Sequence, residues 1–187
     1  MFIQTEETPN PATIKFLPGR MVAGDRAGID LRDAQTAAEV SPLAARLFAV
    51  EGVEGVFLGA DFISVSKSPD MAWPAMKAVV LAAIMDHFVE DAPVLFADAS
   101  APMAQAADGS DDPIIQRIQE ILDQRVRPVV AQDGGDVQFQ SFQDGVVYLH
   151  MRGACAGCPS SQATLKGGIE NLLRHFIPEI QEVRSAS

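Results

Sequence analysis

The chain has 187 residues, of which 48% are hydrophobic and 21% charged, so it can bury one core of ordinary size or two small ones. Its net charge of -11 argues against nucleic acid as a partner, because phosphate binding needs a basic stripe, and against an anionic membrane surface. No apolar run approaches the roughly 20 residues that a membrane-spanning helix needs.

The first 90 residues predict an antiparallel sheet. Two strands are expected at residues 2–6 and 12–17, joined by a turn that is rich in proline and asparagine. Two more are expected at residues 53–58 and 62–67, where apolar and polar positions alternate around a short turn. The pattern indicates two hairpins in one domain.

Two helices accompany these strands. One begins at Pro42, which follows a serine N-cap, and the other covers about residues 71–89, with Asp70 as its N-cap. An apolar stripe that includes Val79 predicts that the second helix packs on the core. Residues 19–40 are polar and irregular apart from one short strand. The order β-β-α-β-β-α is an α+β pattern.

Residues 91–110 change in composition to alanine, proline, serine, aspartate and glycine, which predicts a flexible linker. The chain therefore divides into an N-terminal domain at residues 1–90, the linker at residues 91–110 and a C-terminal domain at residues 111–187. The two domains share no internal repeat.

The C-terminal domain predicts the order α-β-β-α-β. Its first helix starts at Pro113 after an acidic cap, and Pro128 is expected to end it. Strands at residues 137–142 and 146–151 flank an Asp-Gly pair typical of a hairpin turn. A second helix runs to residue 176, and a last strand is expected near residues 179–184. The fold class is therefore α+β, with two small domains, each a mostly antiparallel sheet packed with helices.

Both cysteines of the chain, Cys155 and Cys158, lie between the second of these strands and the following helix. The C-x-x-C spacing brings two sulfur atoms into one small volume. Cys158 directly precedes a helix N-terminus, where free amides and the helix dipole favour thiolate over thiol. Gly153 and Gly157 remove side chains beside the sulfurs, so that backbone N–H groups can approach a bound anion such as an iron–sulfur cluster.

One interpretation is a metal or cluster site. An iron–sulfur cluster or a structural zinc ion normally takes four protein ligands, whereas this chain has two cysteines. A second copy of the chain would complete the set, with the cluster at a two-fold interface. A cluster held by two ligands from each subunit should be released more easily than an enclosed one, which suits a carrier better than an enzyme.

Two other interpretations use the same cysteines. A dithiol/disulfide oxidoreductase also places C-x-x-C between a strand and a helix, and the spacing alone favours metal and redox chemistry about equally. The preceding hairpin, in place of a βαβ unit, and the position of Pro159 after the second cysteine weaken the redox interpretation. A zinc-stapled interaction module remains compatible with the sequence, because tetrahedral thiolate sites suit both metals.

Other candidate residues favour plain structural roles. The Asp-Gly-Gly-Asp segment at residues 133–136 is interpreted as a turn rather than a ligand loop. Lys166 could offset the charge of a cluster, but a solvated helix face is the preferred interpretation. No nucleophile with a supporting motif, phosphate loop or defensible pair of catalytic carboxylates is present, so we expect the protein not to be an enzyme.

The chain resembles the NifU and Nfu protein families over nearly its whole length. In the C-terminal domain the matching stretches are RPVVAQDGGDV at residues 127–137, GACAGCPSS at residues 153–161 and TLKGGIE at residues 164–170. In the N-terminal domain they are TPNP at residues 8–11, KF at residues 15–16, SPLA at residues 41–44 and FLGADFI at residues 57–63.

This resemblance implies an iron–sulfur cluster carrier or scaffold. Cys155 and Cys158 match the cysteines that, in pairs of chains, hold a [4Fe-4S] cluster and pass it to apo-proteins; [2Fe-2S] or zinc is less favoured. The implied partners are apo iron–sulfur clients, an upstream scaffold that donates the cluster, and a second copy of the chain on cluster binding, with no nucleic acid and no membrane. The N-terminal domain is implied to recognise a target or partner.

The N-terminus has neither the basic region of a signal peptide nor the Arg-rich amphipathic pattern of a transit peptide. We therefore expect a cytoplasmic protein of a bacterium, with a mature organellar form as the alternative.

Overall fold

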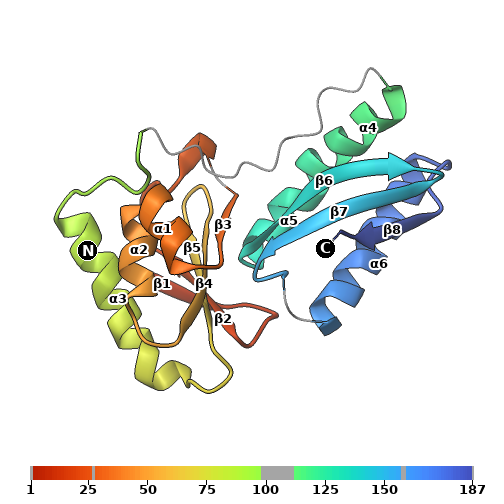
Figure 1. Ribbon diagram of the computed structural model, residues 1–187. Helices are drawn as coiled ribbons and strands as arrows, with labels where there is room; N and C mark the ends of the chain where they lie inside the picture. The colour runs from red at the N-terminus through yellow and green to blue at the C-terminus, as the bar shows by residue number, and fades with distance from the viewer. Residues whose placement is uncertain (1, 27, 98–111, 157–158, 187) are drawn as a thin grey trace. The chain divides into compact units, whose positions relative to one another are not determined.

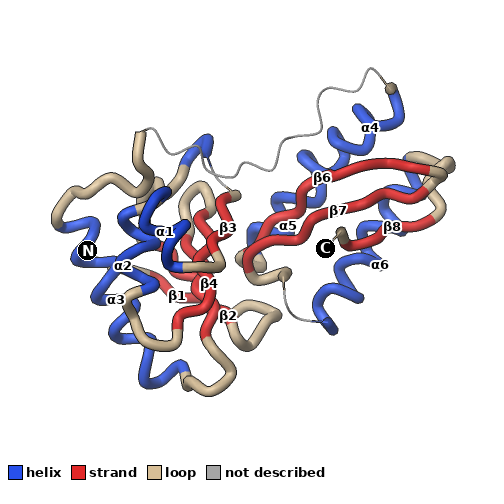
Figure 2. The backbone as a smooth tube through the Cα atoms, in the orientation of Figure 1, coloured by secondary structure: helices blue, strands red, loops and turns tan. Residues whose placement is uncertain are grey.

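The computed structural model describes residues 2–26, 28–97, 112–156 and 159–186. The chain separates into two compact units, Met1–Pro102 and Met103–Ser187 (Figure 1). Each unit has its own hydrophobic core and combines one β-sheet with helices (Figure 2). This arrangement confirms the predicted α+β class with two small domains.

The sheet of the N-terminal unit has five strands in the order β1-β2-β5-β4-β3, and every neighbouring pair is antiparallel. The strands are β1 (Gln4–Glu7), β2 (Thr13–Leu17), β3 (Ile29–Leu31), β4 (Val53–Leu58) and β5 (Ile63–Lys67). The helices are the 3₁₀ turn η1 (Gly24–Arg26), α1 (Ala34–Val40), α2 (Pro42–Phe48) and α3 (Trp73–Val89). Residues from the sheet and from α1, α2 and α3 share one core.

The predicted start of α2 is present in detail. The Ser41 hydroxyl accepts a hydrogen bond from the amide of Ala44 at 3.0 Å, and Pro42 occupies the first turn. The same hydroxyl donates to the carbonyl of Val94 at 2.5 Å. Ser41 therefore caps a helix and fixes a segment 53 residues further along the chain, which is why its side chain is fully buried.

The structure differs from the predictions at two helices of this unit. Helix α1 lies in residues that were expected to be irregular; it begins after Asp33, whose carboxylate accepts from the amide of Thr36 at 2.7 Å. Helix α3 starts at Trp73 with Ala72 as an N-cap that makes no side-chain hydrogen bond, so Asp70 is not its cap. Val79 is 51% exposed and does not belong to the buried stripe of α3.

The described part of the predicted linker, residues 91–97, packs on this N-terminal unit. The amide of Phe96 donates to the carbonyl of Val40 at 3.1 Å, and Val94 and Leu95 pack against the core. The remainder of the predicted linker lies in residues 98–111, outside the described residues.

The C-terminal unit has a three-stranded sheet in the order β6-β7-β8. Strands β6 (Gly135–Gln143) and β7 (Val146–Gly153) form an antiparallel hairpin, whereas β8 (Glu182–Ser185) pairs with β7 in parallel. The helical segments are α4 (Pro113–Ile121), the π-helix η2 (Leu122–Val126), α5 (Arg127–Gln132) and α6 (Pro159–Phe176). Helices and sheet contribute side chains to a single core.

The prediction that the first helix of this unit ends at Pro128 is wrong. Proline has no N–H and its ring clashes with the carbonyl four residues earlier, so an α-helical hydrogen bond cannot continue through it. Before the proline, the α-helix changes to a wider π-helical turn, in which the amide of Arg127 bonds to the carbonyl of Leu122. Pro128 then lies in the first turn of α5. The helical run therefore continues to Gln132 and delivers the chain directly to β6.

No helix among the described residues is long and apolar enough to span a membrane.

Candidate functional site

Cys155 lies in a tight turn that follows β7. Gly153 ends the strand with a φ of 63°, a left-handed conformation that glycine adopts without strain, and the amide of Ala156 bonds to the carbonyl of Gly153 at 3.1 Å. The turn leads into α6, which begins at Pro159. Cys158, the second predicted ligand, lies outside the described residues, so the structure places only one of the two predicted sulfur ligands.

A second turn forms the wall beside Cys155. Residues Asp133 and Gly134 connect α5 to β6, and Gly134 has a φ of 78°. The carbonyl of Gly134 accepts a hydrogen bond from the amide of Ala154 at 3.1 Å, which ties the two turns together. The segment at residues 133–136 includes the turn that its sequence predicted, and it also lines the cysteine site.

Gly135 allows the backbone of β6 to lie directly against Cys155. A Cβ atom added at Gly135 would lie 2.6 Å from the sulfur of Cys155, 2.7 Å from the carbonyl oxygen of Arg152 and 3.1 Å from the amide nitrogen of Cys155. Unlike Gly134, Gly135 has no positive φ, so glycine is needed here for space rather than for conformation. Sequence reasoning assigned both glycines to a turn and missed this contact.

The environment of Cys155 favours the neutral thiol. The residue is only 6% exposed. Burial raises the pKa of the thiol to about 12, and the negative charges of Asp133 and Asp136 act in the same direction. A metal that binds this sulfur must displace its proton.

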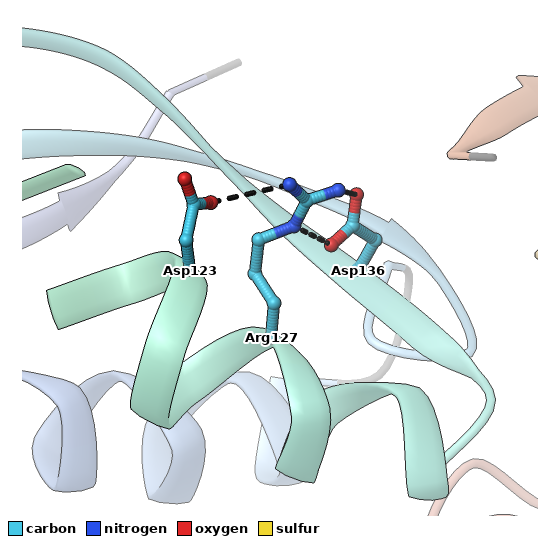
Figure 3. Close-up of polar contacts among 3 residues, drawn as sticks. All are labelled: Asp123, Arg127 and Asp136. Carbon is cyan, nitrogen blue, oxygen red and sulfur yellow. Dashed lines mark hydrogen bonds and ion pairs between the residues drawn. The ribbon is translucent and has the colours of Figure 1, made fainter. Parts of the chain in front are cut away.

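Arg127 and Asp136 form a two-pronged ion pair beside this wall (Figure 3). The Nε of Arg127 donates to one carboxylate oxygen of Asp136 at 2.8 Å and an Nη donates to the other at 3.1 Å. The remaining Nη donates to Asp123, one helical turn earlier, at 3.2 Å. These contacts raise the pKa of Arg127, the Asp136 hydrogen bonds contributing most, so the guanidinium stays charged.

Two other polar residues of the C-terminal unit have ordinary surroundings. The ammonium of Lys166 lies 3.6 Å from a carboxylate oxygen of Glu182, and both side chains are partly exposed. His150 is half-buried on β7 opposite Gln138. Within the described part of the chain, no three His, Cys, Asp or Glu residues are grouped so that they could hold a metal ion. A complete ligand set therefore does not exist within these residues of one chain.

Two family models match the chain. The model described as NifU-like domain matches residues 118–184, and the one described as scaffold protein Nfu/NifU N terminal matches residues 3–91. The two matches fall within different structural units, the first in the C-terminal unit and the second in the N-terminal unit.

Curated relatives match almost the whole chain. The protein named "NFU1 iron-sulfur cluster scaffold homolog, mitochondrial" of Drosophila erecta is 48% identical over 183 residues, which are 98% of this chain and 64% of the relative. The protein of the same name from Drosophila persimilis is 47% identical over the same shares. This chain therefore spans less than two thirds of the length of these relatives.

Two solved structures are similar over about half of the chain. The crystal structure of protein SAV1430 from Staphylococcus aureus has 31% sequence identity and covers 44% of this chain and 98% of its own, with a TM-score of 0.34. The solution structure of a NifU-like protein from Saccharomyces cerevisiae has 23% identity and covers 52% of this chain and 87% of its own, with a TM-score of 0.47.

The relatives correct the expected location. Their names place them in the mitochondrion, which points to a mitochondrial rather than a bacterial cytoplasmic protein and overturns the bacterial prediction. The prediction rested on the first residues of the sequence, which have neither a signal-peptide nor a transit-peptide pattern and do not distinguish a bacterial protein from a mature organellar one.

Proposed function

The chain belongs to the Nfu/NifU family, and from this membership we propose that it is an iron–sulfur cluster scaffold and carrier that delivers its cluster to apo-proteins. The observation that carries the proposal is the position of Cys155. It lies in the turn that follows β7, beside the backbone of Gly134 and Gly135, and four residues before the first residue of α6.

We assign the ligands to Cys155 and Cys158 of two chains. Four thiolates are the usual ligand set of a [4Fe-4S] cluster, and one chain contains two cysteines. A homodimer that forms around the cluster supplies the other two. The cluster is the cargo of the protein rather than a resident cofactor, and two ligands per subunit suit its release.

The partners follow from this role. The protein receives the cluster from an upstream scaffold and transfers it to apo iron–sulfur proteins, and it acts as a carrier, not as an enzyme. We assign the recognition of a target or partner to the N-terminal unit, which contains no cysteine.

The dithiol/disulfide alternative receives less support. An efficient attacking thiol has a pKa near the ambient pH, whereas burial raises the pKa of Cys155 to about 12. A zinc-stapled module would use the same ligands as the cluster, so metal analysis must separate these two.

The test is anaerobic reconstitution with iron and sulfide, followed by the visible absorption spectrum and by iron, sulfide and zinc analysis. The proposal predicts a brown protein with about four irons for every two chains, as four-thiolate ligation requires. Cys155→Ser and Cys158→Ser should each lose the absorption of the cluster. A colourless protein with stoichiometric zinc, or serine variants that keep a full cluster, would contradict the proposal.

A further inference from the structure

We propose that Arg127 is a positioning residue of the proposed cluster site. It acts through Asp136 to hold Gly134 and Gly135, here called the glycine wall, against Cys155. The inference rests on the proposed function, since the site that Arg127 supports is the proposed cluster site. Arg127 itself is on α5 and belongs to no ligand set.

The guanidinium of Arg127 forms a fork with Asp136. Arg127 is the first residue of α5, directly after the π-helix η2, and its guanidinium meets both carboxylate oxygens of Asp136 (Figure 3). The Asp136 side chain is only 12% exposed, whereas that of Arg127 is 43% exposed. A two-pronged guanidinium–carboxylate pair fixes orientation as well as distance, which a lysine ammonium does not.

Asp136 is linked to the cysteine through the glycine that precedes it. Asp136 directly follows Gly135 on β6, and Gly135 faces Cys155 with no room for a methyl group. On the other side of Gly135, the carbonyl of Gly134 bonds to Ala154, the residue before Cys155. A shift of Asp136 therefore moves a wall that is in direct contact with the cysteine turn.

Charge also connects Arg127 to the site. Asp136 directly follows Gly135, whose Cβ position would lie 2.6 Å from the sulfur of Cys155. A cluster held by four thiolates is anionic, so an uncompensated carboxylate beside it is unfavourable. The Arg127 guanidinium balances the Asp136 carboxylate at 2.8 Å and holds it in the fork. Without Arg127, the Asp136 side chain would no longer be held in place and its carboxylate charge would no longer be balanced.

The test compares Arg127→Gln, Arg127→Lys, Asp136→Asn and the double variant Arg127→Gln/Asp136→Asn. Arg117→Gln is the matched control, because Arg117 is an arginine of the same unit that pairs with the exposed Glu120. Each is reconstituted, and the half-life of the cluster absorption is measured in the presence of an iron chelator. Arg127→Gln should shorten the half-life about tenfold, the lower end of the effect expected for groups that orient metal ligands.

The double variant shows whether Arg127 acts through Asp136. If it does, Arg127→Gln has no further effect in the Asp136→Asn background, and the double variant retains its cluster longer than Arg127→Gln alone. Arg127→Lys should fall between the parent and Arg127→Gln, since it keeps the charge and loses the fork.

A measurement on the cluster-free protein separates this inference from the proposed function. In a Cys158→Ser background, the hydrogen-exchange rate of the Ala154 amide, which bonds to the carbonyl of Gly134 at 3.1 Å, reports the closure of the wall. Arg127→Gln and Asp136→Asn should both raise that rate, and Arg117→Gln should leave it at the rate of the Cys158→Ser protein. If even the parent takes up no cluster, the proposed function fails, while this ranking still decides the role of Arg127.

Three results would overturn the inference. The first is parent-like exchange of the Ala154 amide and a parent-like cluster half-life in Arg127→Gln. The second is that the effects of Arg127→Gln and Asp136→Asn simply multiply in the double variant. The third is an equal effect of Arg117→Gln. If Arg127→Gln does not fold, Arg127→Lys and Asp136→Asn each break the fork and test the same contact.

Discussion

The two units bury polar groups for different reasons. In the N-terminal unit the buried hydroxyls complete the fold: Ser41 caps α2, and Thr13 bonds to Ser66 across two strands at 2.7 Å. In the C-terminal unit Asp136 and Arg152 lie opposite each other at one end of the β6–β7 hairpin, next to Cys155. The N-terminal unit also buries Lys15 and His87, but the pairing of Asp136 with Arg127 close to a buried thiol is the feature from which we infer a site in the C-terminal unit.

If this contrast is correct, damage to the N-terminal core should not reach the cluster site. Leu43 is fully buried, and Leu43→Ala should destabilise the N-terminal unit by about 2–5 kcal/mol. Trp73, the single tryptophan of the chain, lies in this unit and reports its unfolding by fluorescence in urea. Under conditions where both units stay folded, iron content after reconstitution should match that of the parent. Loss of iron there would show that the units are coupled.

A change in the glycine wall should damage the C-terminal unit and reduce cluster uptake, and should leave the N-terminal unit unaffected. Gly135→Ala places a Cβ against the sulfur and two backbone atoms that cannot yield, and should destabilise the C-terminal unit by about 1–3 kcal/mol and reduce cluster uptake. Hydrogen exchange of β7 amides measures the first effect and visible absorption the second.

Gly167→Ala is the control, because a Cβ at this position of α6 meets no atom within 4 Å. It should stabilise the C-terminal unit by about 0.5–1 kcal/mol and leave cluster uptake unchanged. Equal damage from both alanines would refute the close-contact role of Gly135.

Acid should act on the N-terminal unit through His87. This residue is fully buried, and burial, followed by the charge of Arg46, lowers its pKa from the ordinary value of 6.5. Below that value the unfolded chain binds a proton that the folded unit excludes, so stability falls as the pH decreases until the lowered pKa is reached. Urea midpoints from Trp73 fluorescence between about pH 7.5 and about pH 5.5 should decrease, and less so in His87→Leu. An unchanged slope in that variant would assign the effect to another group.

The smallest expected effect separates two interpretations of Lys166. Its ion pair with Glu182 is partly exposed, so Lys166→Gln should change stability by less than about 0.5 kcal/mol. If Lys166 offset the charge of the cluster, the same change would shorten the half-life of the cluster. We expect a half-life equal to that of the parent.

Local signals in the sequence predicted much of the fold. Three local patterns predicted their elements correctly, because each depends only on residues close together in the sequence. They are the serine and proline at the start of α2, the Asp-Gly turn between β6 and β7 and the alternation in β5. Helix α1 was missed because it is short and its buried face consists of Ala37 and Val40, which form no long apolar stripe. Pro128 was misinterpreted because the rule that proline ends a helix does not anticipate a π-helix that leaves it in the first turn of a further helix.

In the candidate site, too, the sequence predicted the local features and missed the contacts between distant residues. The C-x-x-C spacing and the resemblance predicted Cys155, but neither could show that Gly135 contacts its sulfur, because this contact joins residues 20 positions apart. The pair of Arg127 and Asp136 was missed for the same reason, since the first residue of α5 and the second residue of β6 meet only in the folded unit. Asp136 lies nine positions after Arg127, and this spacing matches neither a helical nor a strand period.

The proposed function requires that two chains share one cluster. Native mass spectrometry of the anaerobically reconstituted protein tests this directly, because one mass reports both the number of chains and the bound cluster. We predict a dimer that carries a single [4Fe-4S] cluster, about four irons for two chains, and a cluster-free Cys155→Ser protein. A monomer that retains a complete cluster, or a dimer that holds zinc in its place, would contradict it.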